Sequence, residues 1–165
     1  MPQSFDIDSS LQELQRVGLE FVIPEGFETL RYYGFGPTEN YRDRKNSAKL
    51  GVFDGNVEGE HFPFIPPSEN GGHEETRWVV LSNQAGNKLR VSSFVPFHFD
   101  VHHNTVDDYL NAKHEHELIR RPESYLHIDV AHCGIGGDMA WSTVLPASEK
   151  VQATNYQMEI VISVN

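Results

Sequence analysis

Apolar and polar residues alternate along most of this chain, and this period of two constrains its fold more than any other feature. In PFHFDVH, residues 96–102, three apolar side chains alternate with three polar ones. The same pattern recurs in GLEFVI (18–23), ETRWVVLS (75–82), KLRVSSF (88–94), YLHIDVA (125–131) and YQMEIVISV (156–164). Such alternation is typical of β strands with one buried face. The sequence therefore predicts a fold made mainly of antiparallel strands.

One segment has a helical pattern instead. In NTVDDYLNAKHEHEL, residues 104–118, Thr105 is a suitable N-cap, and Asp107 and Asp108 lie favourably in the first turn. Several closely spaced strands and one short helix predict an all-β protein, an antiparallel β-sandwich. Two connecting segments, 34–49 and 62–74, are long for so small a domain, and we expect them to be functional or interfacial.

The charge balance excludes several classes of partner. The 165 residues include 24 acidic and 13 basic ones, which gives a formal charge of -11. Nucleic acids and anionic membranes need a positive patch, so we expect neither as a partner. Cys133 is the only cysteine, which excludes an internal disulfide. The first residues do not resemble a signal peptide and no segment approaches the ~20 apolar residues of a membrane helix, so we expect a cytoplasmic protein.

Histidines are concentrated in the second half of the chain. KHEHEL, residues 113–118, fails the zinc motif H-E-x-x-H because Leu118 stands where the second histidine should be. The polar residues that share a strand face and could hold a metal are His98, Asp100 and His102 on one strand, and His127 and Asp129 on another. The solvated face of an alternating strand explains them more simply, so we predict no metal ligand.

The sequence gives as little support for catalytic residues as for metal ligands. Glycosidase chemistry needs two carboxyl groups ~5–9 Å apart. Glutamates are available at 39, 69, 74, 75 and 117, but none lies in a recognisable catalytic motif. No Ser-His-Asp arrangement or nucleophile elbow is apparent either. We predict no catalytic residue in this chain.

A glycine-rich stretch, HCGIGGDMAWS, occupies residues 132–142. A phosphate-binding P-loop needs Lys and Ser or Thr after its last glycine, whereas here Asp138 follows and would repel a phosphate. Two interpretations remain open on the chemistry of these residues. The stretch is a tight turn with Trp141 in the core, or it presents Trp141 to the apolar face of a sugar while Asp138 accepts hydroxyl hydrogen bonds.

Four segments, in order, resemble motifs of the family 2 β-galactosidases. YYGFGPTENYRDRKNSAKLGVF (32–53) is similar to G-x-GP-x-ENY-x-DR, and FIPPSENGGHEETRW (64–78) to P-x-ENG-x-R. AKHEHEL (112–118) is similar to A-x-H-x-x-EL, and HIDVAHCGIGGDMAWS (127–142) to the family's glycine-rich tryptophan signature. The resemblance is to the later part of the C-terminal domain, which some bacteria encode as a separate small chain.

This resemblance implies a fold and a partner. The family's domain is a large antiparallel, supersandwich-like β-sandwich, which corresponds here to residues 17–165, while residues 1–16 form an N-terminal segment without predicted order. The catalytic glutamates lie in a (β/α)₈ barrel, in the same polypeptide or on a large subunit. The barrel also holds most ligands of the magnesium and sodium ions, so no cofactor is expected from this chain. A chain that corresponds to only part of a larger domain exposes strand edges that the missing strands would cover, and we therefore also expect a homo-oligomer.

The resemblance also assigns roles in the glycine-rich stretch. Trp141 matches the tryptophan that stacks on the acceptor sugar, and Asp138 is a weaker candidate for binding it. The loop-shaping residues are Gly134, Gly136 and Gly137. Met139 and Ala140 replace the family's usual Asp-Ser, which removes one carboxylate and one hydroxyl from the loop.

Three hypotheses follow. The leading one is a C-terminal component of a β-galactosidase, which hydrolyses terminal β-D-galactosides such as lactose and is inactive without its barrel. The alternative is a non-catalytic carbohydrate-binding or structural module, which should saturate with simple sugars by itself. The third is an autonomous metal hydrolase built on the histidines, which should carry bound zinc.

Overall fold

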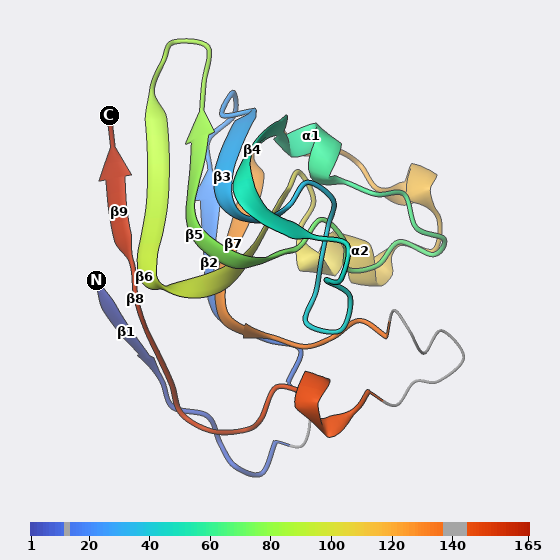
Figure 1. Cartoon of the computed structure of the whole chain (residues 1–165). Helices are drawn as coiled ribbons and strands as arrows, with labels where there is room; N and C mark the ends of the chain where they lie inside the picture. Colours follow the sequence, from blue (N-terminus) through green and yellow to red (C-terminus); the bar gives the residue numbers. More distant parts are fainter. Residues whose placement is uncertain (12–13, 137–144) are drawn as a thin grey trace.

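The computed structural model describes residues 1–11, 14–136 and 145–165, and its regular structure is mostly antiparallel β (Figure 1). The strands are β1 (Pro2–Phe5), β2 (Arg16–Ile23), β3 (Thr29–Gly36), β4 (Lys49–Asn56), β5 (His73–Ser82), β6 (Lys88–His102), β7 (Ser124–His132), β8 (Tyr156–Glu159) and β9 (Val161–Val164). The helices are α1 (Val57–Glu60) and α2 (Val106–Asn111), with single 3₁₀ turns at Glu115–Glu117 and Ala147–Glu149.

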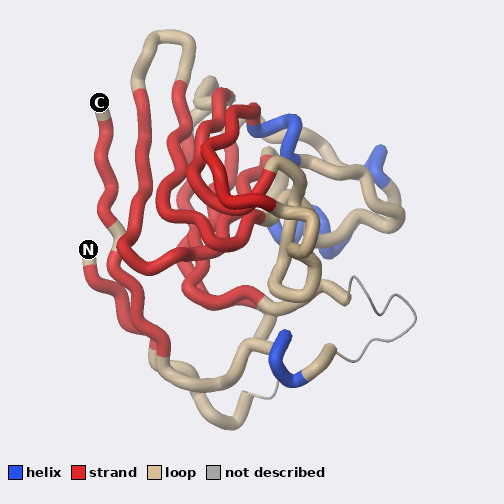
Figure 2. The backbone as a smooth tube through the Cα atoms, in the orientation of Figure 1, coloured by secondary structure: helices blue, strands red, loops and turns tan. Residues whose placement is uncertain are grey.

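The strands form two sheets (Figure 2). The larger has the order β2-β7-β6-β5-β3-β4, and β9 also pairs with β6. Strand β6 is 15 residues long and changes partner along one edge, since residues 89–92 pair with β9 and residues 98–102 with β7. The smaller sheet joins β1 to β8, which brings residues 2–5 against a strand near the other end of the chain. The predicted all-β antiparallel sandwich is confirmed.

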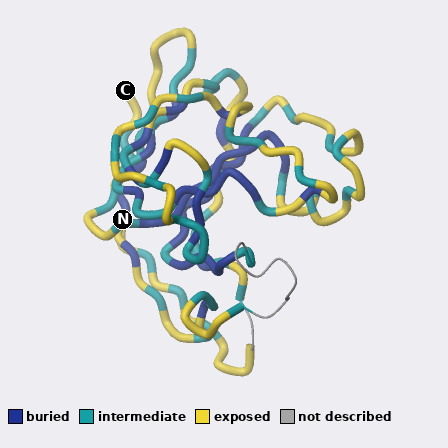
Figure 3. The backbone as a smooth tube through the Cα atoms, turned by 45° about the vertical axis from the view of Figure 1, so that its right-hand side comes forward, coloured by how far each residue is buried: buried dark blue, intermediate teal, exposed yellow. Residues whose placement is uncertain are grey.

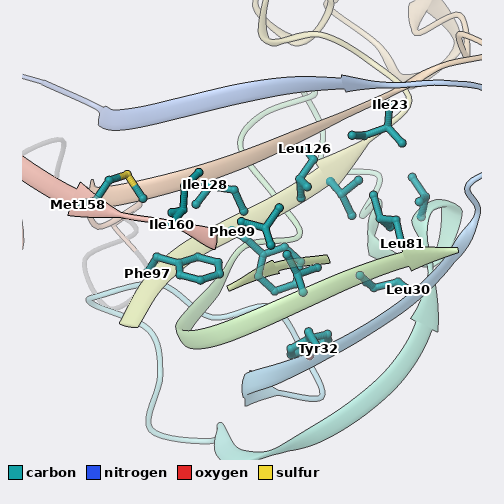
Figure 4. Close-up of a cluster of buried hydrophobic side chains, with 14 residues drawn as sticks. Ile23, Leu30, Tyr32, Leu81, Phe97, Phe99, Leu126, Ile128, Met158 and Ile160 are labelled. Carbon is teal, nitrogen blue, oxygen red and sulfur yellow. The ribbon is translucent and has the colours of Figure 1, made fainter. Parts of the chain in front are cut away.

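The apolar side of the alternating runs forms the core (Figure 4). Phe97, Phe99 and Val101 of β6 are at most 3% exposed and pack with Leu126 and Ile128 of β7. Further core side chains come from β3, β5 and the β8 segment: Leu30, Tyr32, Val79, Leu81, Met158 and Ile160. Figure 3 shows the buried backbone running through the middle of the molecule, with exposed loops around it.

Two helices are present among the described residues, where the sequence predicted one. Thr105 caps α2 as expected: its hydroxyl accepts from the Asp108 N–H, and the Asp108 carboxylate accepts from the Thr105 N–H. The helix has six residues and ends at Asn111, which agrees with the short helix predicted for this segment. Helix α1 has only four residues, too few to show a helical period in the sequence. No helix in the described ranges is both long and apolar enough to cross a membrane.

The interpretation of the polar strand faces as solvated is wrong. The histidines and aspartates that β6 and β7 direct away from the apolar core are all buried: His98, Asp100, His102, His127 and Asp129. The reason is that the β3–β4 loop and the segment before β5 contact this face, so that Tyr41 lies against the ring of His98 and the Asn70 carbonyl accepts from His102. The two long loops thus enclose a second, polar interior.

Candidate functional site

The two long loops interlock above the polar face of β6 and β7. The Tyr41 hydroxyl accepts a hydrogen bond from the Gly72 N–H at 3.1 Å and donates to Oε1 of Glu69 at 3.3 Å. The Asn40 N–H donates to the Gly72 carbonyl, while its side-chain oxygen accepts from the Glu74 N–H at 2.8 Å. The ENY and ENG segments therefore form one continuous layer.

Glycines allow this layer to lie close to the strands. A Cβ atom on Gly72 would lie 2.5 Å from the His98 ring, and one on Gly71 would lie 2.7 Å from the His102 ring. Gly71 also has a φ of +69°, a conformation that favours glycine. Larger residues at these positions would push the loop layer off the polar face.

An arginine is the centre of the polar interior. Arg16, from β2, places Nη2 2.5 Å from a carboxylate oxygen of both Asp100 and Asp129, each with a side chain 2% exposed. Burial opposes ionisation of Asp100, but the charges of Arg16 and His127 hold its pKa well below the ordinary value. Burial raises the pKa of Asp129 despite the same arginine. The two buried carboxylates thus share one half-buried cation.

His127 is held between two acids. Its Nδ1–H donates to Asp100 at 2.7 Å, and its Nε2–H donates to Glu20 of β2 at 3.0 Å. Burial and the charge of Arg16 favour the neutral ring, yet the carboxylates of Asp100 and Asp129 raise the pKa of His127 above its ordinary value. Two carboxylate acceptors favour the imidazolium form, since only that form donates from both nitrogens.

The start of the glycine-rich loop is tied to the ENY-x-DR segment. The backbone N–H groups of Ile135 and Gly136 donate to the two carboxylate oxygens of Asp43, at 3.1 and 2.7 Å. A Cβ atom on Gly134 would lie 2.6 Å from Cγ of Asp43, and Gly136 has a φ of +80°. The Gly134 N–H donates to the Glu149 carbonyl. Two segments that the resemblance singled out separately therefore meet here.

The other residues predicted for this loop lie outside the described part of the chain. These residues are Gly137, Asp138 and Trp141, together with the substitutions Met139 and Ala140.

A cavity of about 640 Å³ lies between the glycine-rich loop and the polar interior. Gly134, Gly136 and Leu145 contribute to its wall, as do Arg16, Glu69 and His132. Helix α2 supplies an apolar portion through Tyr109 and Leu110. Its volume is in the range that binds small organic ligands, and its mixture of carboxylate, guanidinium, imidazole and apolar groups suits a polar molecule with hydroxyls.

Sequence reasoning named many residues of this lining within its motifs, but it did not bring them together into one cavity. Arg16 belongs to no recognised motif, whereas Glu69 was considered as a candidate acid and lies in the ENG motif of the resemblance. Their proximity depends on the pairing of β2 with β7 and of β6 with β7. An arginine at the start of an alternating run, in an otherwise acidic chain, is the one weak signal available.

Comparison with known proteins shows the family of this chain. The chain belongs to the β-galactosidase small-chain family, whose model matches residues 2–162. It is 31% identical over 163 residues to the β-galactosidase of Streptococcus thermophilus and 34% identical over 159 residues to that of Vibrio cholerae. These alignments cover 96% and 94% of this chain but only 16% and 15% of the relatives, so the chain spans about one-sixth of their length. The resemblance inferred from the motifs is confirmed.

Proposed function

We propose that this chain is the C-terminal small-chain component of a cytoplasmic β-galactosidase that hydrolyses terminal β-D-galactosides such as lactose. The observation that carries the proposal is the family match over residues 2–162, in a chain that covers only 15–16% of two much longer β-galactosidases. The remaining length leaves room for a catalytic (β/α)₈ barrel, in the same polypeptide or on a large subunit. A retaining mechanism would use two glutamates of that barrel, one as nucleophile and one as acid and then base.

In this proposal the chain forms one wall of the acceptor-sugar site. The support is the position of Gly134 and Gly136 on the cavity wall, with Asp43 fixing the start of the loop that leads to Trp141. Stacking of an indole on a sugar contributes about 1 kcal/mol. Enzymes lower barriers by about 8–23 kcal/mol, so such a contact tunes acceptor choice and does not create catalysis.

The described residues of this chain do not fit the family's magnesium ion. Magnesium prefers oxygen ligands and usually keeps several waters. The two most buried carboxylates, Asp100 and Asp129, already share Arg16, and imidazoles lie beside them. We therefore propose that the barrel holds the magnesium and sodium ions.

The stacking role is tested with Trp141→Ala in the assembled enzyme. We expect acceptor binding and transglycosylation to weaken about fivefold, the equivalent of about 1 kcal/mol, while attack on an activated aryl galactoside changes little. Trp78→Ala is the matched control, because Trp78 lies on β5 under the guanidinium of Arg90 and does not line the cavity. Equal losses on both substrates would contradict the stacking role.

A non-catalytic carbohydrate-binding module is the second candidate. The observation that favours it is that this chain alone supplies a cavity of sugar-binding size. Calorimetric titration of the isolated chain with galactose and lactose separates the two functions. Weak or undetectable binding supports a composite site shared with a barrel, and saturation at micromolar sugar supports an independent binding module.

A further inference from the structure

Two buried imidazoles and one carboxylate converge beneath the interlocked loops. His98 comes from β6, His132 from the end of β7, and Glu69 from the loop before β5. One potential ligand atom from each residue lies within 4.8 Å of the other two. Nε2 of His132 is 3.7 Å from Oε1 of Glu69, and the two imidazole rings lie 4.3 Å apart between centroids.

The hydrogen bonds of both rings determine which nitrogen is free to bind a ligand. Nδ1–H of His98 donates to the Glu74 carboxylate at 3.1 Å, and Nδ1–H of His132 donates to the Cys133 carbonyl at 2.8 Å. In a neutral imidazole the other nitrogen then carries a lone pair. Histidines that bind metals are held in this way, with the remote N–H donated to a carboxylate or a carbonyl. Both rings are therefore oriented to offer Nε2.

One of these nitrogens lacks a partner. Nε2 of His98 is buried and has no hydrogen-bond partner among the residues that the structure describes, and His98 is only 3% exposed. A buried polar atom without a partner is costly and points to a bound water, an ion or a specific role. This observation is independent of the clustering of the three side chains.

The surroundings favour a cation and give it access. Glu69, Asp100 and Asp129 face a single guanidinium, that of Arg16, which lies 3.8 Å from Glu69. If all three carboxylates are ionised, their negative charge exceeds the combined positive charge of Arg16 and of the His127 imidazolium that donates to Asp100. Glu69 and His132 line the cavity, so an ion can enter from it and a water can complete its coordination.

We propose that His98, His132 and Glu69 bind a divalent transition-metal ion, with Zn²⁺ as the best match, and leave one position open to the cavity. Two imidazole nitrogens and one carboxylate oxygen are a common ligand set for zinc with an open position, whereas magnesium and calcium prefer oxygen ligands throughout. The inference goes beyond the proposed function and does not depend on it. Sequence spacing predicted no such site, because three separate segments supply the ligands.

The geometry also predicts the strength of binding. In a tetrahedral zinc site the ligand atoms lie about 3.4 Å apart, so the His132–Glu69 pair is already close to the required distance. The two rings are nearly parallel, at 21°, and must open because a metal lies in the plane of each imidazole that binds it. This rearrangement weakens binding relative to a preformed site, and we expect micromolar affinity.

The test is calorimetric titration of the metal-free 165-residue chain with Zn²⁺, followed by metal analysis after dialysis. We expect one Zn²⁺ per chain, and a loss of affinity of at least about tenfold in His98→Gln and in Glu69→Gln. Cobalt(II) in place of zinc should give the visible absorption of a tetrahedral site. Glu69 is half-buried, so Glu69→Gln tests the site even if His98→Gln unfolds, and circular dichroism checks both variants.

A second cluster provides the matched control. His114, His116 and Glu117 are exposed, and their potential ligand atoms also lie within 4.8 Å of one another. The double variant His114→Gln/His116→Gln should bind zinc as tightly as the unaltered chain. The proposal is overturned if zinc binding disappears in this control and persists in Glu69→Gln, or if the unaltered chain binds no zinc at micromolar concentrations.

Discussion

The pairing of Arg16 with two buried carboxylates gives the sharpest prediction about stability. Arg16→Met keeps the apolar part of the side chain and removes the guanidinium, whose Nη2 lies 2.5 Å from both Asp100 and Asp129. Each carboxylate is 2% exposed, and loss of the guanidinium leaves both without their shared cationic partner. Removing one member of a buried ion pair costs about 3–5 kcal/mol. For a domain of this size, that loss lowers the Tm by roughly 6–20 °C.

The matched control removes an arginine from an exposed pair. Nε of Arg31 lies 3.4 Å from Asp54, and the two side chains are 59% and 69% exposed. Exposed pairs contribute about 0–1 kcal/mol, so Arg31→Met should change the free energy of unfolding little. Urea unfolding of the chain and its variants, followed by tryptophan fluorescence, measures both changes.

A second substitution separates loss of charge from loss of packing. Asp129→Asn in the Arg16→Met background removes one uncompensated carboxylate and should restore part of the lost stability. If Arg16→Met and Arg31→Met differ by less than about 1 kcal/mol, the buried carboxylates do not depend on Arg16 and the reasoning is refuted.

Three further predictions concern the loop, the pH dependence and the core. Gly134→Ala should destabilise the chain by about 2 kcal/mol or more in urea unfolding, because its Cβ would lie 2.6 Å from Cγ of Asp43. The control Gly86→Ala, at φ +86° with no atom within 4 Å of the new Cβ, should cost about 1 kcal/mol. Equal costs for the two variants would contradict the collision with Asp43. The raised pKa of His127 adds to the free energy of unfolding below about pH 6.5, and this contribution is lost as the pH rises through the raised pKa. His127→Gln should therefore make the free energy of unfolding depend less on pH between about pH 6 and 8. An unchanged pH dependence would contradict the role given to His127. Phe99→Ala should lower the free energy of unfolding by about 3–5 kcal/mol in the same assay, because Phe99 is completely buried. A decrease below about 1 kcal/mol would be inconsistent with that burial.

The strands and the apolar core could be predicted from the sequence. The alternation in residues 96–102 places Phe97, Phe99 and Val101 in the core, and Thr105 caps the helix as its chemistry suggests. These features are local, since a few neighbouring residues determine both the buried face of a strand and a capping box. Helix α1 was missed because four residues carry no period.

The polar interior beneath the two long loops could not be predicted in this way. His98 and Asp100 alternate with apolar residues just as they would on a solvated strand, and only the contact with the loop layer buries them. Motifs identified the family, and two of them meet where Asp43 binds the N–H of Gly136. The junction of Glu69 with His132 depends instead on tertiary packing, which spacing along the chain does not encode.

The central claim is that this chain works as part of a β-galactosidase. The most direct measurement is the size of the polypeptide that carries this sequence in its source cells, determined with an antibody to the chain, together with the galactosidase activity of the captured material. The account predicts a much longer chain, or this chain with a barrel-sized partner, and activity in either case. Capture of a free, inactive chain of 165 residues would contradict it.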